Sequence, residues 1–192
     1  MNAASRAKSI VIDPLVAWAR IEQEGDDPAL LLSRYVAVLA LIPAVFGFIG
    51  TSLIGTVVPG VGTLRTPVFD GLFGAIFGYV MTCGTVLLLA LLIDLVAPLF
   101  GGRRDFESAF RLAAYSFTPV WLVGVFLVLP GLRFLVLLGF YGAYVLWRGL
   151  PQLMKSPERR SQIFVALIVA VAFAFTYLAA AAQRAVFGTP GL

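Results

Sequence analysis

Asp94 is the side chain in this sequence with the clearest capacity for chemistry, because it is a carboxylate within the apolar run Leu-Ile-Asp94-Leu-Val-Ala-Pro98. A carboxylate near a membrane needs water, a cation or hydrogen-bond donors, and is by default a candidate functional group. We interpret Asp94 first as a structural pair that joins helix ends, and second as an ion or proton site. Its expected partners are Arg111, Arg148 and Lys155, which are predicted on the same side of the membrane.

A second group of polar side chains lies in the next two apolar runs: Tyr115, Ser116 and Thr118, just before Pro119, and then Tyr141 and Tyr144. Such side chains can hydrogen-bond between helices or line a shallow cavity, and we favour the first use. Ser116 is a poor candidate nucleophile, because the chain has no histidine and no well-placed lysine to activate it.

The residues that are missing limit the possible reactions. The absence of histidine removes the Ser–His and Cys–His dyads and the zinc motif HExxH. The single cysteine, Cys83, lies in an apolar run and is interpreted as a packing residue. No glycine-rich phosphate loop is present. We therefore predict a protein that is not an enzyme, with no cofactor and no metal, although a buried lysine or carboxylate still leaves an enzyme open.

The composition indicates a membrane protein, because 60% of the residues are hydrophobic and 12% are charged, against about half and about a quarter in soluble domains. Five apolar runs are long enough to cross a bilayer. They are predicted at residues 35–57, 71–95, 112–129, 134–153 and 163–182. Pro43 and Pro119 fall inside the first and third runs, and the connection at 130–133 is short enough to require an antiparallel helical hairpin.

Before the first span, residues 1–34 are predicted to form a cytosolic segment, which precedes a membrane domain at 35–184 and a short tail at 185–192. Asp13-Pro14 is typical of a helix start, and the apolar residues that follow predict a short amphipathic helix. Trp18 on this helix suits the lipid headgroup region. Packing of the same face against the protein's own helix ends explains the pattern equally well.

Small residues recur every three or four positions in three spans, which permits close contact between helices. The stripes are Ala40, Ala44, Gly47, Thr51 and Gly55 in the first span, Gly74, Gly78 and Thr82 in the second, and Ala166, Ala170 and Ala174 in the fifth. We favour packing within one monomer over homodimerisation. Asp70 is interpreted as a cap at the start of the second span.

The basic residues predict the orientation. With the N-terminus inside, eleven lysines and arginines fall in cytoplasmic segments and three in outer ones. This bias satisfies the positive-inside rule and places the C-terminus outside. The net charge of +4 requires no nucleic-acid partner, since basic residues at helix ends attract anionic lipid headgroups.

Several stretches, taken together, resemble the bacterial branch of the Yip family of Ypt/Rab-interacting membrane proteins. They are residues 94–102, 114–119 and 141–157, with the N-terminal stretch 9–18. The resemblance implies a five-span domain in the bacterial inner membrane with a cytosolic N-terminus. Eukaryotic members of the family are associated with small GTPases and membrane trafficking.

We therefore predict an all-α polytopic bundle of five transmembrane helices preceded by a short amphipathic helix. Its expected role is that of a scaffold that binds lipid, another membrane protein or a second copy of itself. The alternative is a small ion or solute transporter that uses Asp94. The candidate site, at the cytoplasmic ends of spans two to four, comprises Asp94, Pro98, Gly101, Gly102, Tyr115, Thr118, Pro119, Tyr144, Arg148, Gly149, Pro151 and Lys155.

Overall fold

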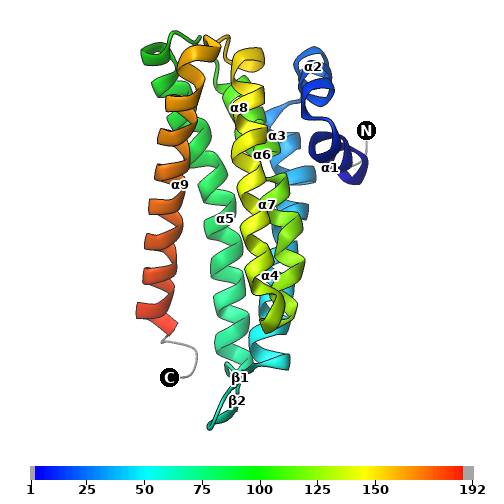
Figure 1. The fold of residues 1–192 in the computed structure, drawn as a ribbon, viewed down its shortest axis with the longest axis vertical. Helices are drawn as coiled ribbons and strands as arrows, with labels where there is room; N and C mark the ends of the chain where they lie inside the picture. Colours follow the sequence, from blue (N-terminus) through cyan, green and yellow to red (C-terminus); the bar gives the residue numbers. More distant parts are fainter. Residues whose placement is uncertain (1–2, 188–192) are drawn as a thin grey trace.

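The computed structural model describes residues 3–187, which form a bundle of long helices with two short helices against one end (Figure 1). Five helical segments are long and apolar enough to cross a membrane. They are Pro28–Ile54, Val68–Phe100, Phe106–Val128, Gly131–Leu153 and Glu158–Gln183. The predicted all-α membrane bundle with five spans is confirmed.

Most spans contain local changes of helix type. The elements are α1 (Ala3–Ile12), α2 (Pro14–Glu24), α3 (Pro28–Leu31), η1 (Leu32–Val36), α4 (Ala37–Phe48), η2 (Ile49–Ile54), α5 (Val68–Val96), η3 (Ala97–Phe100), α6 (Phe106–Ser116), α7 (Thr118–Val123), η4 (Gly124–Val128), η5 (Pro130–Phe140), α8 (Tyr141–Leu153) and α9 (Glu158–Phe187). Pro43 lies inside α4. Pro119 lies in the first turn of α7, where its missing N–H costs no hydrogen bond, so the third span breaks there without losing its course.

The two ends of the bundle differ in the elements that cover them. Strands β1 (Thr56–Val58) and β2 (Gly62–Leu64) form an antiparallel hairpin in the connection between the first two spans, where the sequence predicted only a loop. We call this the hairpin end. The opposite end, where α1 and α2 lie, is the α1/α2 end (Figure 1).

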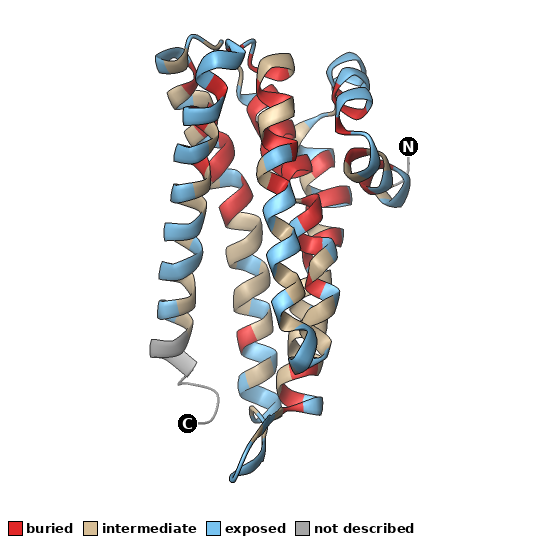
Figure 2. Cartoon of the chain, viewed as in Figure 1, coloured by how far each residue is buried: buried red, intermediate tan, exposed pale blue. Residues whose placement is uncertain are grey.

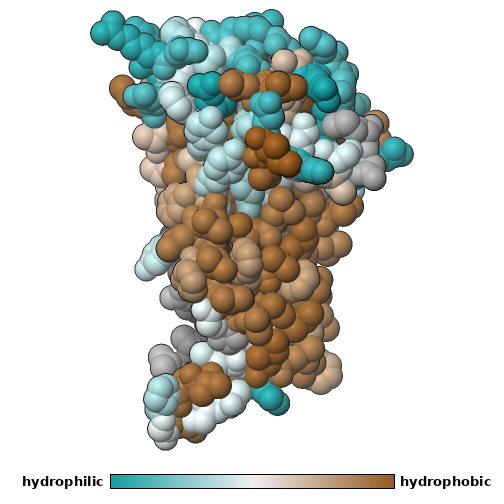
Figure 3. Space-filling view, turned by 45° about the vertical axis from the view of Figure 1, so that its right-hand side comes forward, coloured by the Kyte–Doolittle hydropathy of each residue, from teal (hydrophilic) through white to brown (hydrophobic). Residues whose placement is uncertain are grey.

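Burial is unequal along the bundle, and the buried residues gather toward the α1/α2 end (Figure 2). The third span is the most enclosed, with 56% of its most apolar stretch buried, whereas the corresponding value for the fifth span is 11%. A brown, hydrophobic surface covers most of the bundle below the polar α1/α2 end (Figure 3). Since lipid tails solvate such a surface, its exposure fits a membrane-embedded bundle.

The structure corrects two predictions about packing. Ala166, Ala170 and Ala174 are exposed on α9, so this stripe is not a contact between helices of one monomer. Alanine can face lipid because acyl chains are as apolar as the protein interior. Asp70 is exposed in the first turn of α5 and does not cap it, because the helix already begins at Val68. A carboxylate there still complements the positive end of the helix dipole.

Candidate functional site

The predicted site residues lie toward the α1/α2 end, but the structure divides them into two groups. Tyr115, Thr118, Pro119 and Gly149 are buried among the helices. The remaining residues are half-buried or exposed, and most of them lie at or beside the loops that end α5 and α8: Asp94, Pro98, Gly101, Gly102, Tyr144, Arg148, Pro151 and Lys155. The first group therefore builds the interior of this end, and the second contributes to its surface.

Tyr115 is the centre of the buried group. Its side chain, on α6, is 2% exposed. Its hydroxyl donates a hydrogen bond to Oδ2 of Asp26, with 2.5 Å between the oxygens. Its ring meets the rings of Tyr35 and Trp18 edge-on, with centroids 4.8 Å and 6.1 Å away. Edge-on aromatic pairs add to the free energy gained by burial, so Tyr115 joins the N-terminal segment to the first and third spans.

A second buried hydrogen bond joins the first span to the third. The hydroxyls of Tyr35 and Thr118 lie 2.7 Å apart, and Thr118 is fully buried. Because both groups are removed from water, losing either partner would leave a buried hydroxyl unsatisfied. This pair therefore fixes how the first span meets the start of α7.

Arg6, on α1, is a buried cation that closes the network. It forms ion pairs with Glu24 and with Asp26, the latter at 3.7 Å, and its guanidinium lies 5.7 Å from the centre of the Tyr115 ring. Burial alone would lower the pKa of Arg6, but the hydrogen bond to Glu24 and the nearby negative charges raise it above its usual value. Arg6 therefore stays charged and ties α1 to the end of α2.

The loop between α2 and α3 is held by α6. The side chain of Arg111 donates from Nε to the backbone oxygen of Asp26 (2.7 Å) and from Nη2 to Glu107 (3.0 Å). Gly25 ends α2 in a left-handed conformation, with φ of 61°, which a glycine adopts without strain. The Asp26 loop thus receives hydrogen bonds from Tyr115 and Arg111, both on the third span.

Gly149 allows α2 to lie directly against α8. A Cβ at this position would come 2.6 Å from Cε2 of Trp18 and 2.5 Å from Cδ1 of Leu112. Trp18 is fully buried, and its indole N–H donates to the backbone oxygen of Val145 at 3.0 Å. Of the two interpretations left open for the amphipathic helix, the structure shows Trp18 packed against the protein's own helices. The predicted cap is confirmed, since the side chain of Asp13 accepts from the N–H of Val16.

The partners predicted for Asp94 are wrong. Asp94 pairs with Arg104, with 3.4 Å between Nη2 and Oδ2, and the side chain of Arg104 is 60% exposed. The three predicted partners lie elsewhere: Arg111 pairs with Glu107, Lys155 with Glu22, and Arg148 stacks over Trp147. The physical reason is the turn at Gly101, whose φ of 79° brings the following loop back toward the end of α5.

The loops after α5 and α8 contact each other. The backbone N–H of Arg103 donates to the carbonyl of Met154 at 2.8 Å. A Cβ on Gly102 would lie 2.9 Å from that same carbonyl oxygen, so a larger residue would separate the loops. Lys155 adopts the left-handed region with φ of 55°. The glycines at 101 and 102 therefore serve the turn and this close approach.

An aromatic strip lies along α8 on the surface of the same end. Tyr141, Tyr144 and Trp147 are in sequential ring contact, with centroids 5.4 Å and 6.2 Å apart. The guanidinium of Arg148 lies 5.6 Å from the Trp147 ring, and its buried Nε has no hydrogen-bond partner among the described residues. We call these four residues the aromatic–arginine strip. Pro98 is exposed in η3, directly after α5, and Pro151 is half-buried in α8.

Sequence reasoning missed the partners that complete the buried group. Arg6 entered only the count of basic residues, Tyr35 only marked the start of a span, and Asp26 only marked a helix break. One signal was available, because the cation of Arg6 and the carboxylates of Glu24 and Asp26 lie in the same polar N-terminal segment. The pattern does not show that a tyrosine 89 residues further along the chain would join them.

Three cavities accompany this architecture. One of about 320 Å³ lies among α5, α6, α8 and α9, and one of about 690 Å³ lies nearer the hairpin end between α4 and α5. The third, of about 210 Å³, lies beside Arg6, Asp26 and Tyr115. Asp94 lines none of the three. Within residues 3–187, no three histidine, cysteine, aspartate or glutamate residues gather in a way that would hold a metal ion.

Comparison with known proteins agrees with this fold. The family model of the Yip1 domain matches residues 8–180. The inner membrane protein YohC of Escherichia coli K12 is 25% identical over 155 residues, which cover 79% of this chain and 80% of YohC, and YohC of Escherichia coli O6:H1 matches to the same extent. No solved structure matches. Because the family model covers most of the sequence, the chain belongs to the Yip1 domain family of membrane proteins.

Proposed function

We propose that this protein is a non-enzymatic docking scaffold of the bacterial inner membrane, and that its α1/α2 end binds another membrane protein. The observation that carries the proposal is the contrast within this end. Inside it, Tyr115, Thr118 and Arg6 are all paired with other protein groups. Its surface, in contrast, carries the aromatic–arginine strip, in which Tyr141 and Tyr144 are 36% and 42% exposed.

The composition of the strip supports a protein partner. Tyrosine, tryptophan and arginine are the residues that dominate binding energy at protein interfaces. Tyr144 is 42% exposed although its ring contacts two aromatic neighbours, so it can contribute area without losing much rotamer freedom. Packing against Trp18 through Gly149 holds α8 in place, which presents the strip on a rigid element.

The proposed orientation puts the α1/α2 end in the cytoplasm, as the basic residues indicate. Arg103, Arg104, Arg159 and Arg160 are exposed at this end and would lie near anionic headgroups. The test uses Cys83→Ala with a new cysteine at either Arg159 or Thr63. A membrane-impermeant maleimide should label Thr63→Cys in intact spheroplasts and Arg159→Cys only after lysis. The reverse pattern would overturn the orientation.

Transport through Asp94, the alternative, gains no support from this geometry. Asp94 is paired with Arg104 near the end of α5 and lies outside the three cavities described. An ion or proton site within a membrane protein usually faces the bundle interior or a water-filled cavity. The pair instead joins α5 to the loop that follows it, which is the structural use of Asp94.

Affinity purification from native membranes in mild detergent, followed by quantitative mass spectrometry, tests the docking role. The wild-type protein should retain one partner in near-stoichiometric amount. Tyr144→Ala combined with Arg148→Glu should lower its recovery at least ~10-fold, as expected when hot-spot residues worth ~1.4 kcal/mol or more are lost. The matched control is Arg65→Glu, which removes an exposed arginine at the hairpin end.

Two results would contradict the docking role. One is a partner whose recovery is the same for the double variant and for Arg65→Glu, which would place binding elsewhere on the protein. The other is a protein that purifies with lipid alone at every detergent strength. Size-exclusion profiles of each variant exclude misfolding as the cause of a lost partner.

A further inference from the structure

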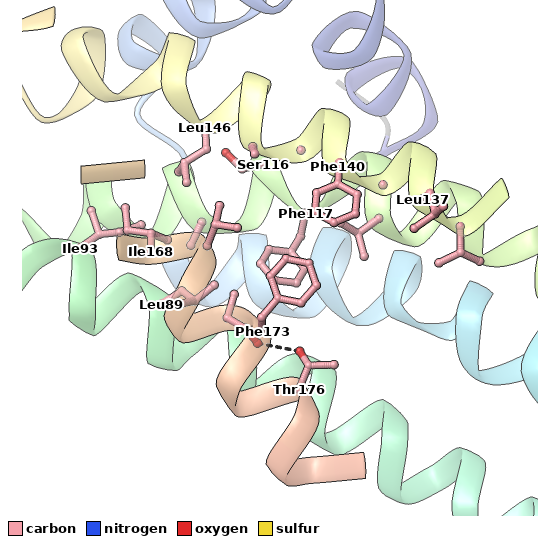
Figure 4. A pocket seen from close by; sticks show the side chains of 18 residues that line it. Leu89, Ile93, Ser116, Phe117, Leu137, Phe140, Leu146, Ile168, Phe173 and Thr176 are labelled. Carbon is pink, nitrogen blue, oxygen red and sulfur yellow. Dashed lines mark hydrogen bonds between the residues drawn. The ribbon is translucent and has the colours of Figure 1, made fainter. Parts of the chain in front are cut away.

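The cavity of about 320 Å³ has walls that are almost entirely apolar (Figure 4). Leu89 and Ile93 of α5 lie on one side, and Phe140, Phe173 and Leu146 come from η5, α9 and α8. The hydroxyl groups in its lining belong to Ser116 and Thr176. All of these residues lie in the helical segments that are apolar enough to cross a membrane. The cavity is therefore a hydrophobic space at membrane depth.

The two hydroxyls differ in how they are used. Thr176 donates to the backbone oxygen of Ala172 at 2.8 Å, within its own helix (Figure 4). Ser116 is 5% exposed, and its Oγ is buried with no hydrogen-bond partner among the described residues. A buried hydroxyl normally finds a partner, because leaving it unpaired is costly. Ser116 thus lines the cavity with an unpaired but covered hydroxyl, which a rotation about its Cα–Cβ bond would turn toward the open space.

The size and the lining of the cavity decide what can fill it. The cavity is partly open at the surface of the bundle, so a lipid chain can reach it. Water needs two to four polar partners, and this cavity offers one free hydroxyl, so ordered water is a poor occupant. Its volume is at the low end for ligand pockets. The cavity is too small to hold a helix, which is about 10 Å across. A single slender hydrophobic chain remains.

The direction of the cavity indicates which chain. At the α1/α2 end its lining includes Ile93 and Leu146, which are close in the chain to the charged residues Asp94 and Arg148. Along α9 it extends from Ile168 toward the hairpin end at Thr176, eight residues or about 12 Å further along the helix axis. Its lining therefore runs from the neighbourhood of charged residues into the apolar part of the bundle. A phospholipid changes from polar to apolar in the same way, from its ester group to the end of its acyl chain.

We propose that this cavity holds one acyl chain of a membrane phospholipid, and that the hydroxyl of Ser116 turns toward it to donate a hydrogen bond to the ester carbonyl. The chain would then pass Phe140 and Phe173 toward Thr176. This site is separate from the aromatic–arginine strip and does not depend on the docking role. The bound chain would fill the space between α9 and the rest of the bundle, and the loosely packed α9 would then form one wall of the lipid site.

Photo-crosslinking with depth-specific probes tests the proposal. The protein is reconstituted in phosphatidylethanolamine–phosphatidylglycerol vesicles that contain a phosphatidylglycerol with a diazirine either near the ester or near the end of one acyl chain. After illumination, peptide mass spectrometry maps the crosslinks. The probe near the ester should label residues around Ser116 and Leu146, and the probe at the chain end should label residues around Leu137 and Thr176.

Filling the cavity gives the matched variants. Ala172→Trp places a large ring in the lining and should reduce crosslinks at the cavity residues at least 5-fold, whereas Ala170→Trp, on the exposed face of the same helix, should leave them unchanged. Ala143→Leu fills the cavity from α8 and should act in the same direction if Ala172→Trp fails to fold. Ser116→Ala should lower the crosslinks of the probe near the ester about 3-fold more than those of the chain-end probe.

Three results would overturn the proposal. Crosslinks spread evenly over exposed positions such as Leu91 and Phe134, and insensitive to Ala172→Trp, would mean that the cavity holds no specific chain. Equal labelling by the two probes at every depth would contradict the direction of the chain. Native mass spectrometry that finds a different hydrophobic molecule, such as a quinone, in place of phospholipid would replace the proposed occupant.

Discussion

The two ends of the bundle are built on different principles. At the α1/α2 end, polar side chains from distant parts of the chain are buried and paired, as Tyr115 is with Asp26 and Tyr35 with Thr118. Toward the hairpin end, Nη2 of Arg133 is buried without a partner among the described residues, and a cavity of about 690 Å³ lies between α4 and α5. A Cβ on Gly78, which lines that cavity, would meet nothing within 4 Å.

This difference shows where the sequence specifies one structure. Buried hydrogen bonds and edge-on rings require one geometry, so the α1/α2 end has a single arrangement of α1, α2, α6 and α8. Close contact between small residues specifies a geometry less strictly, and along α5 close contact is present at Gly71 and Gly74 but absent at Gly78, where a Cβ would meet nothing within 4 Å. We therefore expect substitutions in the paired interior of the α1/α2 end to be costly and a substitution that faces the open space beside α5, as at Gly78, to be tolerated.

The largest effect is expected from Trp18→Ala. Truncating a fully buried aromatic costs about 3–5 kcal/mol, and Trp18 also donates to Val145. We expect a clear loss of thermal stability and faster hydrogen exchange across residues 3–24. The control is Phe69→Ala, a residue that is 77% exposed near the hairpin end. Equal stability of the two variants would show that the N-terminal helices are not packed as described.

A pair of glycine substitutions compares the two ends most closely. Gly149→Ala places a methyl group 2.6 Å from the Trp18 ring and should cost about 1–3 kcal/mol through overpacking. Gly78→Ala adds the same methyl group to open space and should stabilise the helix by up to about 1 kcal/mol. Thermal unfolding in detergent measures both. A destabilising Gly78→Ala would indicate that the space beside α5 is closed.

An effect similar in size to that of Gly149→Ala is expected from Tyr115→Phe, which removes one hydroxyl and keeps the ring. The lost hydrogen bond to a carboxylate should cost about 1.5–3 kcal/mol. Tyr177→Phe is the matched control, because Tyr177 is 70% exposed on α9. Hydrogen exchange at the Asp26 loop should increase in the first variant only. An unchanged loop would mean that Tyr115 does not hold it.

The smallest effect concerns Asp105, which caps α6. Partial burial alone would raise the pKa of Asp105, but hydrogen bonds from Ser108 and the charge of Arg103 lower it below its usual value. Asp105 is therefore expected to stabilise the fold at pH above about 4, the usual aspartate value, and this contribution is lost as the pH falls through the lower pKa of the folded state. Asp105→Ala should cost about 1 kcal/mol at neutral pH, and the difference from wild type should shrink on acidification. A difference that is independent of pH would contradict the capping role.

Much of the fold could be predicted from local sequence signals. Long apolar runs identify the five spans because the bilayer requires that length, and Asp13-Pro14 identifies the start of α2 because both residues act within one turn. The turn at Gly101-Gly102 is likewise local. The prediction of Ala166, Ala170 and Ala174 as an internal contact was wrong, because hydropathy does not distinguish a lipid-facing surface from a helix-facing one.

The candidate site could be predicted only in part. Tyr115 and Thr118 could be predicted as hydrogen-bonding groups, but their partners Asp26 and Tyr35 lie more than 80 residues away in the chain. Spacing carries no information about such pairs. The partners assigned to Asp94 were wrong for a similar reason, because a shared side of the membrane does not place two side chains within reach.

The most direct test of the account is site-specific photo-crosslinking in living cells. A photoreactive amino acid replaces Tyr144 in the aromatic–arginine strip or, for comparison, Phe134 or Phe69, which are exposed elsewhere on the protein. Docking at the α1/α2 end predicts one discrete crosslinked species from position 144 and none of the same mass from 134 or 69. The same species from all three positions, or a species from 134 and 69 alone, would contradict docking at the α1/α2 end.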